Sequence, residues 1–157
     1  MATDPTPPAP AADPPLDTVD ALVQLSFLTQ RILSAVGAEH DLSIIQIRLL
    51  GVLRDRQVGM LELGGHLGLD KSSMTGLVSR AEKRGLVRRS PSPHDGRAVL
   101  VSLTPAGRRL AEYGSAEIRR RITELTAGLT VDQVAQLTQL AAGLVCVQPQ
   151  LLAGRAD

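Results

Sequence analysis

The 157-residue sequence has few aromatic side chains. It contains one tyrosine, one phenylalanine and no tryptophan, although hydrophobic residues make up 43% of the chain. The core must therefore be aliphatic, which suits helices packed on helices better than an aromatic-rich β-sandwich. The composition predicts a mainly α-helical protein, and the length is that of one ordinary domain.

The sequence also has few residues that could form disulfides or bind a metal ion. A single cysteine, Cys146, excludes an intrachain disulfide and a cysteine-clustered zinc site. It falls in an apolar helical seam, where we expect a buried, inert thiol in preference to a redox sensor. The histidines, His40, His66 and His94, lack the i, i+4 spacing of a helical metal pair, so no metal or other cofactor is expected.

Targeting and enzyme motifs are missing as well. Residues 1–16 are rich in proline and alanine and lack the basic and apolar regions of a secretory signal, so we expect a disordered lead-in. No run approaches the roughly 20 uninterrupted apolar residues of a membrane helix. The glycines of 64–68 follow no predicted strand, and no nucleophile elbow or P-loop is present. We expect a cytoplasmic protein that is not an enzyme.

Charge is distributed unevenly along the chain. The net charge is +1, but residues 71–97 contain seven basic and two acidic side chains, a net +5 that leaves −4 elsewhere. Such a segment is either a solvated helix face or a surface for an anionic partner such as nucleic acid.

Apolar periodicity and capping residues indicate six helices. In the third we expect Leu61, Leu63 and Leu67 to point inward, and in the last we expect Pro149 to end the helix. Residues 57–59 read as a break, and two β-prone runs, 86–89 and 98–103, predict a two-stranded hairpin. The helices are expected over about 17–37, 44–53, 60–67, 71–84, 105–127 and 130–148.

The fourth predicted helix has two contrasting faces. Asp70 is a natural N-cap, Gly85 a natural terminator, and Met74, Leu77 and Val78 begin one apolar stripe. The opposite face has only small hydrogen-bonding or cationic side chains. Two helices with a short turn, the second basic and polar, followed by a hairpin, are the order expected of a winged helix-turn-helix.

These features predict a DNA-reading surface. Arg80 is the best candidate for base reading because arginine makes a bidentate contact to guanine. Asp95 can orient Arg97 toward a narrow minor groove, although a local ion pair closing the hairpin is the alternative. Arg88 and Arg89 alternate along the strand, so one is expected to touch phosphate while the other faces solvent. The candidate DNA-contacting residues are Lys71, Ser72, Ser73, Thr75, Gly76, Ser79, Arg80, Lys83, Arg88, Arg89, Asp95 and Arg97.

The central segment resembles the MarR (multiple antibiotic resistance regulator) family. The resemblance lies in residues 67–78 (LGLDKSSMTGLV), 83–89 (KRGLVRR), 95–97 (DGR) and 101–107 (VSLTPAG). Gly96 stands where the family commonly has a second arginine, a departure from the family pattern at one wing contact. The resemblance implies one domain over 17–149, with the winged helix-turn-helix at about 44–104, dimerisation helices at about 17–37 and 105–148, and a tail at 150–157.

The resemblance also implies partners. Terminal helices of two subunits would interlock, and the homodimer would bind a pseudo-palindromic operator on double-stranded DNA, usually as a repressor. The apolar seams at 22–36 and 134–145 agree, because they exceed what one small core needs. A small phenolic or lipophilic effector would enter a pocket that the family layout places near Leu25, Arg31, His40, Leu50 and Tyr113. The alternative is a winged-helix adaptor that no longer binds specific DNA.

Overall fold

The computed structural model describes residues 15–93 and 98–153, with side chains to residue 146. The expected disorder of residues 1–16 falls almost wholly outside these ranges, and so does part of the tail. The described elements are α1 (Thr18–Ala38), α2 (Ile44–Leu53), β1 (Val58–Gly59), α3 (Met60–Leu67), α4 (Lys71–Lys83), β2 (Val87–Pro91), β3 (Val99–Leu103), α5 (Pro105–Leu125) and α6 (Val131–Ala153).

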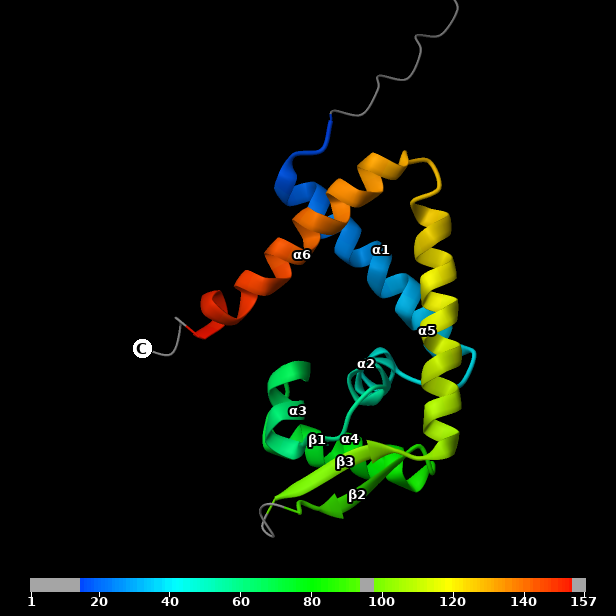
Figure 1. Ribbon diagram of the computed structural model, residues 1–157, viewed down its shortest axis with the longest axis vertical. Coiled ribbons are helices and arrows are strands. Elements are labelled where there is room, and N and C mark those ends of the chain that lie inside the picture. The colour runs from blue at the N-terminus through cyan, green and yellow to red at the C-terminus, as the bar shows by residue number, and fades with distance from the viewer. Residues whose placement is uncertain (1–14, 94–97, 154–157) are drawn as a thin grey trace, which may run out of the picture.

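The chain forms a compact lobe, and the helices α1, α5 and α6 extend above it (Figure 1). The lobe holds α2, α3, α4 and the sheet around an aliphatic core, in which Leu49, Leu53, Leu63 and Leu77 are fully buried. Helix α5 rises from the lobe, and α1 and α6 lie above it. Helices α3 and α4, their short turn and the following β2–β3 hairpin confirm the predicted mainly α, winged helix-turn-helix class.

The sheet has one strand more than predicted. Its order is β1-β3-β2, with both pairs antiparallel, and Val58 of β1 lies opposite Val101 of β3. The prediction of a break at 57–59 was wrong because two residues are too short to show an alternating pattern. They become a strand by pairing with the edge of β3 that β2 leaves free.

Helix α3 buries a narrower face than predicted. Leu63 and Leu67 are in the core, but the side chain of Leu61 is 93% exposed. Two residues correspond to roughly 200° around a helix, so Leu61 and Leu63 lie on opposite sides. The inward placement of Leu61 was therefore wrong.

Helix α6 differs from the prediction in two respects. It continues through Pro149 to Ala153. A proline removes one hydrogen bond and its ring crowds the carbonyl four residues earlier, which can kink a helix without ending it. Cys146 is exposed rather than buried, because α6 lies above the lobe and packs closely on no other described element.

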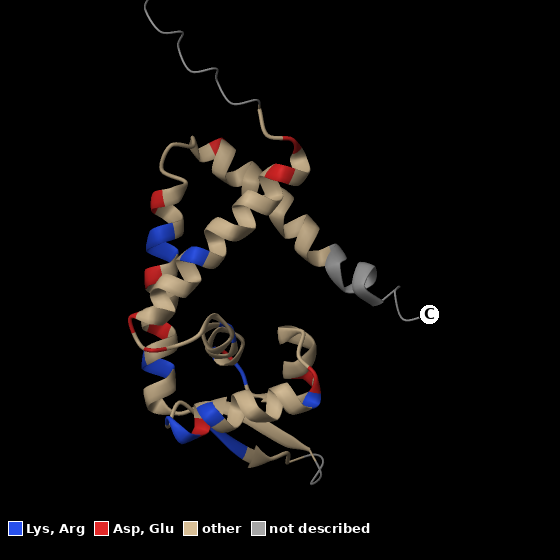
Figure 2. Ribbon diagram, turned by 180° about the vertical axis from the view of Figure 1, so that it is seen from behind, with Lys and Arg blue, Asp and Glu red and all other residues tan. Residues whose placement is uncertain are grey.

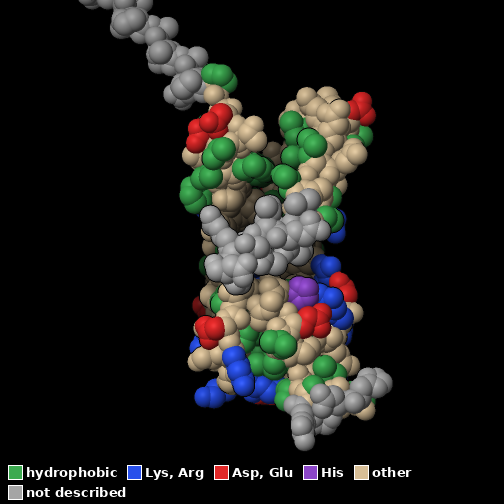
Figure 3. Space-filling model, turned by 90° about the vertical axis from the view of Figure 1, so that its left-hand side faces the viewer, with side chains coloured by type: hydrophobic (Ala, Val, Ile, Leu, Met, Phe, Trp, Pro, Cys, Tyr) green, Lys and Arg blue, Asp and Glu red, His purple; other side chains and the backbone are tan. Residues whose placement is uncertain are grey.

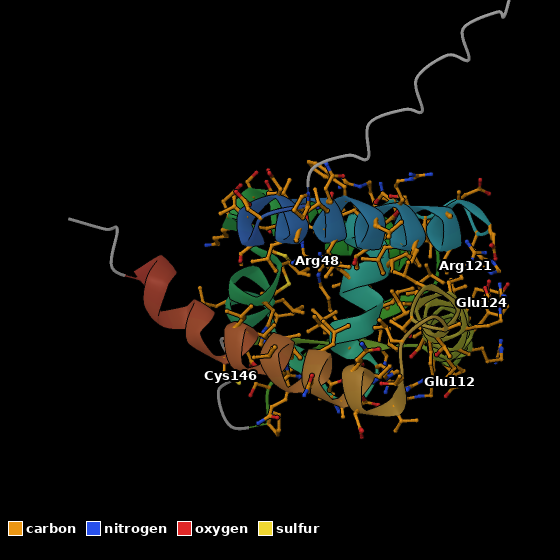
Figure 4. The ribbon with its side chains drawn as sticks, turned by 90° about the horizontal axis from the view of Figure 1, so that it is seen from above. Arg48, Glu112, Arg121, Glu124 and Cys146 are labelled. Atoms are coloured by element: carbon orange, nitrogen blue, oxygen red, sulfur yellow. The ribbon has the colours of Figure 1, made fainter. Side chains whose placement is uncertain are left out.

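Helices α1 and α6 separate in space although they cross in Figure 1. Seen from above, they lie on opposite sides of the structure (Figure 4). By length and composition alone α1 could span a membrane, with a mean hydropathy of 1.2 over an 18-residue window of which 11% is buried. Its last turns pack on α2 and α5 through residues such as Leu33 and Val36. Its first turns are left with an uncovered apolar surface.

Charged side chains join the end of α1 to α5. Arg121, on the side of α5 facing α1 (Figure 4), pairs with Glu39 and also with Glu117. The Tyr113 hydroxyl donates to Glu39 at 2.9 Å, and this carboxylate raises the pKa of the tyrosine. At the opposite end of the same connection, the Arg84 guanidinium, just past α4, donates to the carbonyls of His40 and Asp41 at 2.9 and 2.6 Å. The α1–α2 connection therefore joins α5 to α4.

The α5 network predicts a pH dependence. Hydrogen bonds from Arg120 and then Arg121 lower the pKa of Glu117 from 4.5 to about 2. A carboxyl with a depressed pKa stabilises the fold above its ordinary pKa, and this contribution is lost as the pH falls toward the folded-state value. Glu117→Gln should lower the free energy of unfolding at neutral pH, and the deficit should shrink between pH 4.5 and about 2. Urea unfolding across this range measures it; a deficit independent of pH contradicts the assignment.

Candidate nucleic-acid interface

Helix α4 is held by caps at both ends. The Asp70 carboxylate accepts the backbone N–H groups of Ser72 and Ser73 at 2.8 and 3.0 Å, and the Ser73 hydroxyl at 2.6 Å. The Ser73 hydroxyl is the main cause of the lowered pKa of Asp70. Gly68 and Gly85 bracket the helix with φ of +66° and +70°, which favours glycine. The predicted caps and the buried stripe are confirmed.

The free face of α4 has unpaired positive charges. Lys71, Arg80 and Lys83 are exposed, and they form no ion pair with any residue that the structure describes. The lysine and arginine positions of α4 and β2 lie along the lower edge of the lobe (Figure 2). The same edge carries blue side chains in the space-filling view (Figure 3). An exposed cationic helix without partners is suited to phosphate or base contacts.

Small residues on the same face leave the backbone of α4 accessible. The Thr75 hydroxyl donates to the carbonyl of Lys71 at 2.8 Å, so in this state its proton is engaged and its lone pairs are free to accept. Ser72 is also exposed. A Cβ on Gly76 would lie 3.3 Å from Nη1 of Arg80, which shows that the arginine folds back over the glycine.

Arg88 and Arg89 of β2 lie in different surroundings. Arg88 is exposed, and its Nε donates to the Ser102 hydroxyl at 3.1 Å. Arg88 therefore faces solvent, as one of the two was expected to do, whereas Arg89 is only partly exposed. Its guanidinium pairs with Glu82 at 2.6 Å and reaches back to α4, because β2 packs alongside that helix.

A groove of about 510 Å³ runs between α4 and the strands of the wing. Its lining includes Thr75 and Ser79 of α4, Arg89 and Val99 of the strands, and Met60 at the start of α3. The predicted wing-tip pair, Asp95 and Arg97, lies outside the described residues.

The five residues predicted around an effector pocket do not surround one cavity. Leu50 is 2% exposed and lines a cavity of about 220 Å³ between α1, α2 and α5. His40 and Tyr113 contact each other edge to face, with ring centroids 4.9 Å apart, but they do not line that cavity. Leu25 and Arg31 are exposed on α1.

Sequence reasoning missed other residues at both places. Arg48 (Figure 4) and Arg54 line the cavity beside Leu50. Arg48 lies on α2 and Arg54 directly follows it. Nothing in the sequence indicated that they line a cavity, because only the tertiary packing of α5 closes it. Glu82 was counted only as a negative charge within a basic segment, although its partner at i+7 could have been suspected from the return of the chain in β2. No group of three or more potential metal-ligating residues occurs in the described part of the chain.

Comparisons with known proteins agree with this geometry. Residues 40–98 match the model of the MarR family. The chain is 32% identical to the multiple antibiotic resistance protein MarR of Escherichia coli K12 over 112 residues, which cover 70% of this chain and 78% of that protein. It is 26% identical to the homoprotocatechuate degradative operon repressor of E. coli, over 76% of this chain and 82% of the repressor.

Solved structures give the same result. The crystal structure of wild-type apo MarR from E. coli superposes with a TM-score of 0.72 and 27% identity, covering 84% of this chain and 98% of that chain. A mutant of that protein complexed with operator DNA superposes with a TM-score of 0.63 and 28% identity, over 82% of this chain and 99% of that one. The fold, the segment of strongest sequence match and the extent of the identity together show that this chain belongs to the MarR family of DNA-binding transcription regulators.

Proposed function

We propose that this regulator binds a pseudo-palindromic operator as a homodimer, with α4 of each subunit in the major groove and each wing beside the adjacent minor groove. The observation that carries the proposal is the exposed cationic face of α4, where Lys71, Arg80 and Lys83 form no ion pair with another described residue. Thirteen residues give a helix about 20 Å long, and a major groove about 12 Å wide admits it.

The contacts are divided by chemistry. Arg80 reads a base, since its fork matches the acceptors of guanine, while Lys71, Lys83 and Arg88 neutralise phosphates. Ser72, Ser73, Thr75 and Ser79 supply short polar contacts, and Gly76 lets the backbone approach. The wing-tip residues Asp95 and Arg97 complete the surface by resemblance to the family.

Dimerisation is supported by apolar surface that one subunit leaves open. Large hydrophobic side chains are exposed on both α1 and α6, and they line a hollow between the two helices (Figure 3). A monomeric soluble protein rarely exposes so extended an apolar patch. A second copy placed over it by a two-fold axis would cover it. The exposed residues on these helices include Val19, Leu22, Val23, Leu25, Phe27, Val131, Leu137, Leu140, Leu144 and Val145.

Repression and effector control form the finer part of the proposal. We place the protein in the cytoplasm, where it meets DNA. A small lipophilic effector would use the cavity beside Leu50, because that cavity lies between the dimerisation helices and the DNA-binding lobe. Filling it would change the angle between them and lower operator affinity.

Fluorescence anisotropy with DNA flanking the protein's own gene, across a salt series, tests the DNA contacts. A specific complex should weaken linearly on a logarithmic scale, with a slope of about 0.9 per neutralised phosphate. Arg80→Ala should cost roughly 1 to 3 kcal/mol and relax base preference at one position. Arg31→Ala, on exposed α1, is the matched control and should leave binding unchanged.

Two results would count against the proposal. A lack of specific binding at low salt, to flanking or genome-selected DNA, would favour the adaptor alternative. A loss in Arg80→Ala that is equal on every DNA sequence would mean that Arg80 contacts phosphate rather than a base.

A further inference from the structure

Glu82 is the only acidic residue of α4, and it lies on the helix that faces DNA in the proposed complex. Its carboxylate is half-exposed, at 39%. Near a polyanion such a charge is repelled, and the cost is reduced only when a cation pairs with it. Its partner, Arg89, comes from the neighbouring strand β2.

Arg89 contacts α4 at three positions. Nη1 donates to Oε2 of Glu82 at 2.6 Å, and Nη2 donates to the Ser79 hydroxyl at 2.9 Å and to the carbonyl of Thr75 at 3.4 Å. One guanidinium therefore spans two turns of the helix. This pattern uses the planar fork of arginine, which a lysine cannot reproduce.

Glu82 also binds the backbone of the wing. Its Oε1 accepts the Arg89 backbone N–H at 3.3 Å. Strand β2 is at the edge of the sheet, with β3 on one side only, so an outward N–H there needs another acceptor. The carboxylate thus holds both the side chain and the main chain of Arg89.

We propose that the Glu82–Arg89 pair is a clamp that sets the angle between α4, the recognition helix, and the wing formed by β2 and β3. In this proposal Arg89 is a positioning residue rather than a phosphate contact. The inference rests on the proposed DNA complex and changes the role of one residue in it. With its charge neutralised by Glu82, Arg89 adds little to counterion release. Arg89 instead holds α4 and the wing in an orientation that lets α4 enter the major groove while the wing reaches the adjacent minor groove.

Salt dependence distinguishes a clamp from a phosphate contact. We would measure operator and random-sequence affinity across a salt series for wild type, Arg89→Gln, Arg89→Lys, Glu82→Gln and Arg88→Gln. A residue that neutralises a phosphate changes the slope by about 0.9, whereas a positioning residue changes affinity at constant slope. Arg88 is the matched control, because it is the adjacent arginine on the same strand and is exposed.

The clamp predicts four results. Arg89→Gln and Arg89→Lys should each weaken operator binding about tenfold, the effect of losing a charge-assisted contact, with the slope unchanged. Glu82→Gln should weaken operator preference while steepening the slope by about 0.9, since the freed guanidinium can then reach phosphate. Arg88→Gln should flatten the slope by about 0.9. Thermal unfolding of each variant shows whether it is folded.

Other outcomes would overturn the inference. If Arg89→Gln flattens the slope as Arg88→Gln does while Arg89→Lys behaves as wild type, Arg89 is a phosphate contact. If neither Arg89 variant nor Glu82→Gln changes operator preference, the pair has no positioning role. Both results leave the proposed function intact, because wild type would still bind its operator with a steep salt dependence. The loss of that behaviour would count against the proposed function itself.

Discussion

Gly107→Ala should strongly destabilise this protein. A Cβ at Gly107 would lie 1.9 Å from the carbonyl oxygen and 2.8 Å from the carbonyl carbon of Leu86. Both atoms are backbone, so no side-chain rotation relieves the clash. Hydrogen bonds also hold the first turn of α5 against the segment at Gly85 and Leu86. The Thr104 hydroxyl donates to the Gly85 carbonyl at 2.6 Å and accepts the Gly107 N–H at 3.0 Å.

The expected loss is at least about 3 kcal/mol, the upper part of the range for overpacked sites. This corresponds to a melting temperature lower by about 10 °C for a chain of this size. Urea and thermal unfolding measure the change. In an isolated helix the same substitution would be favourable by roughly 1 kcal/mol, so the sign of the effect reports the packing.

Gly51→Ala is the matched control. Gly51 also lies inside a helix, α2, but a Cβ there meets nothing within 4 Å. Alanine should therefore raise the free energy of unfolding by roughly 0.5 to 1 kcal/mol. If both variants were equally stabilised, the close approach of α5 to Leu86 would be wrong.

The second large effect is expected from charging the apolar face of α6. Leu140 and Leu144 are 70% and 60% exposed in the single chain, one helical turn apart. In the proposed homodimer a partner covers them, so Leu140→Glu with Leu144→Glu would bury two unpaired carboxylates. Sedimentation equilibrium should show a monomer. Operator affinity should fall by about 100-fold or more, because one subunit engages one half-site and the gain from linking two sites is lost.

Gln139→Glu provides the control for added charge. Residue 139 is exposed and lies roughly opposite the apolar face around α6, so its carboxylate remains in water. This variant should stay dimeric and bind DNA with nearly wild-type affinity. A doubly substituted protein that remained dimeric would contradict the assignment of α6 to the interface, whatever its DNA affinity.

For α4, the local sequence was sufficient to predict the structure of the helix. Asp70, the apolar stripe beginning at Met74, and Gly85 are local signals, and each acts as predicted because capping and periodicity depend on neighbours within a turn or two. The polar face follows automatically from the same period. Identification of Lys71 and Arg80 as exposed cations needed nothing more.

The remaining parts of the candidate site depend on contacts distant in sequence. Val58 forms a strand only because β3 offers an open edge, and Arg89 meets Glu82 only because the wing returns along α4. Leu61 was misplaced for a local reason, since three leucines in eight residues were assigned to one face that two of them occupy.

The sequence by itself determined the aliphatic helical composition, the caps and stripe of α4, and its cationic face, because these follow from side-chain chemistry and helical period. Tertiary structure alone decided the rest. It placed Gly107 against Leu86, closed a cavity beside Leu50, turned Arg89 from a free cation into a partner of Glu82, and left Cys146 exposed. These properties depend on which distant surfaces meet, and no local pattern specifies that.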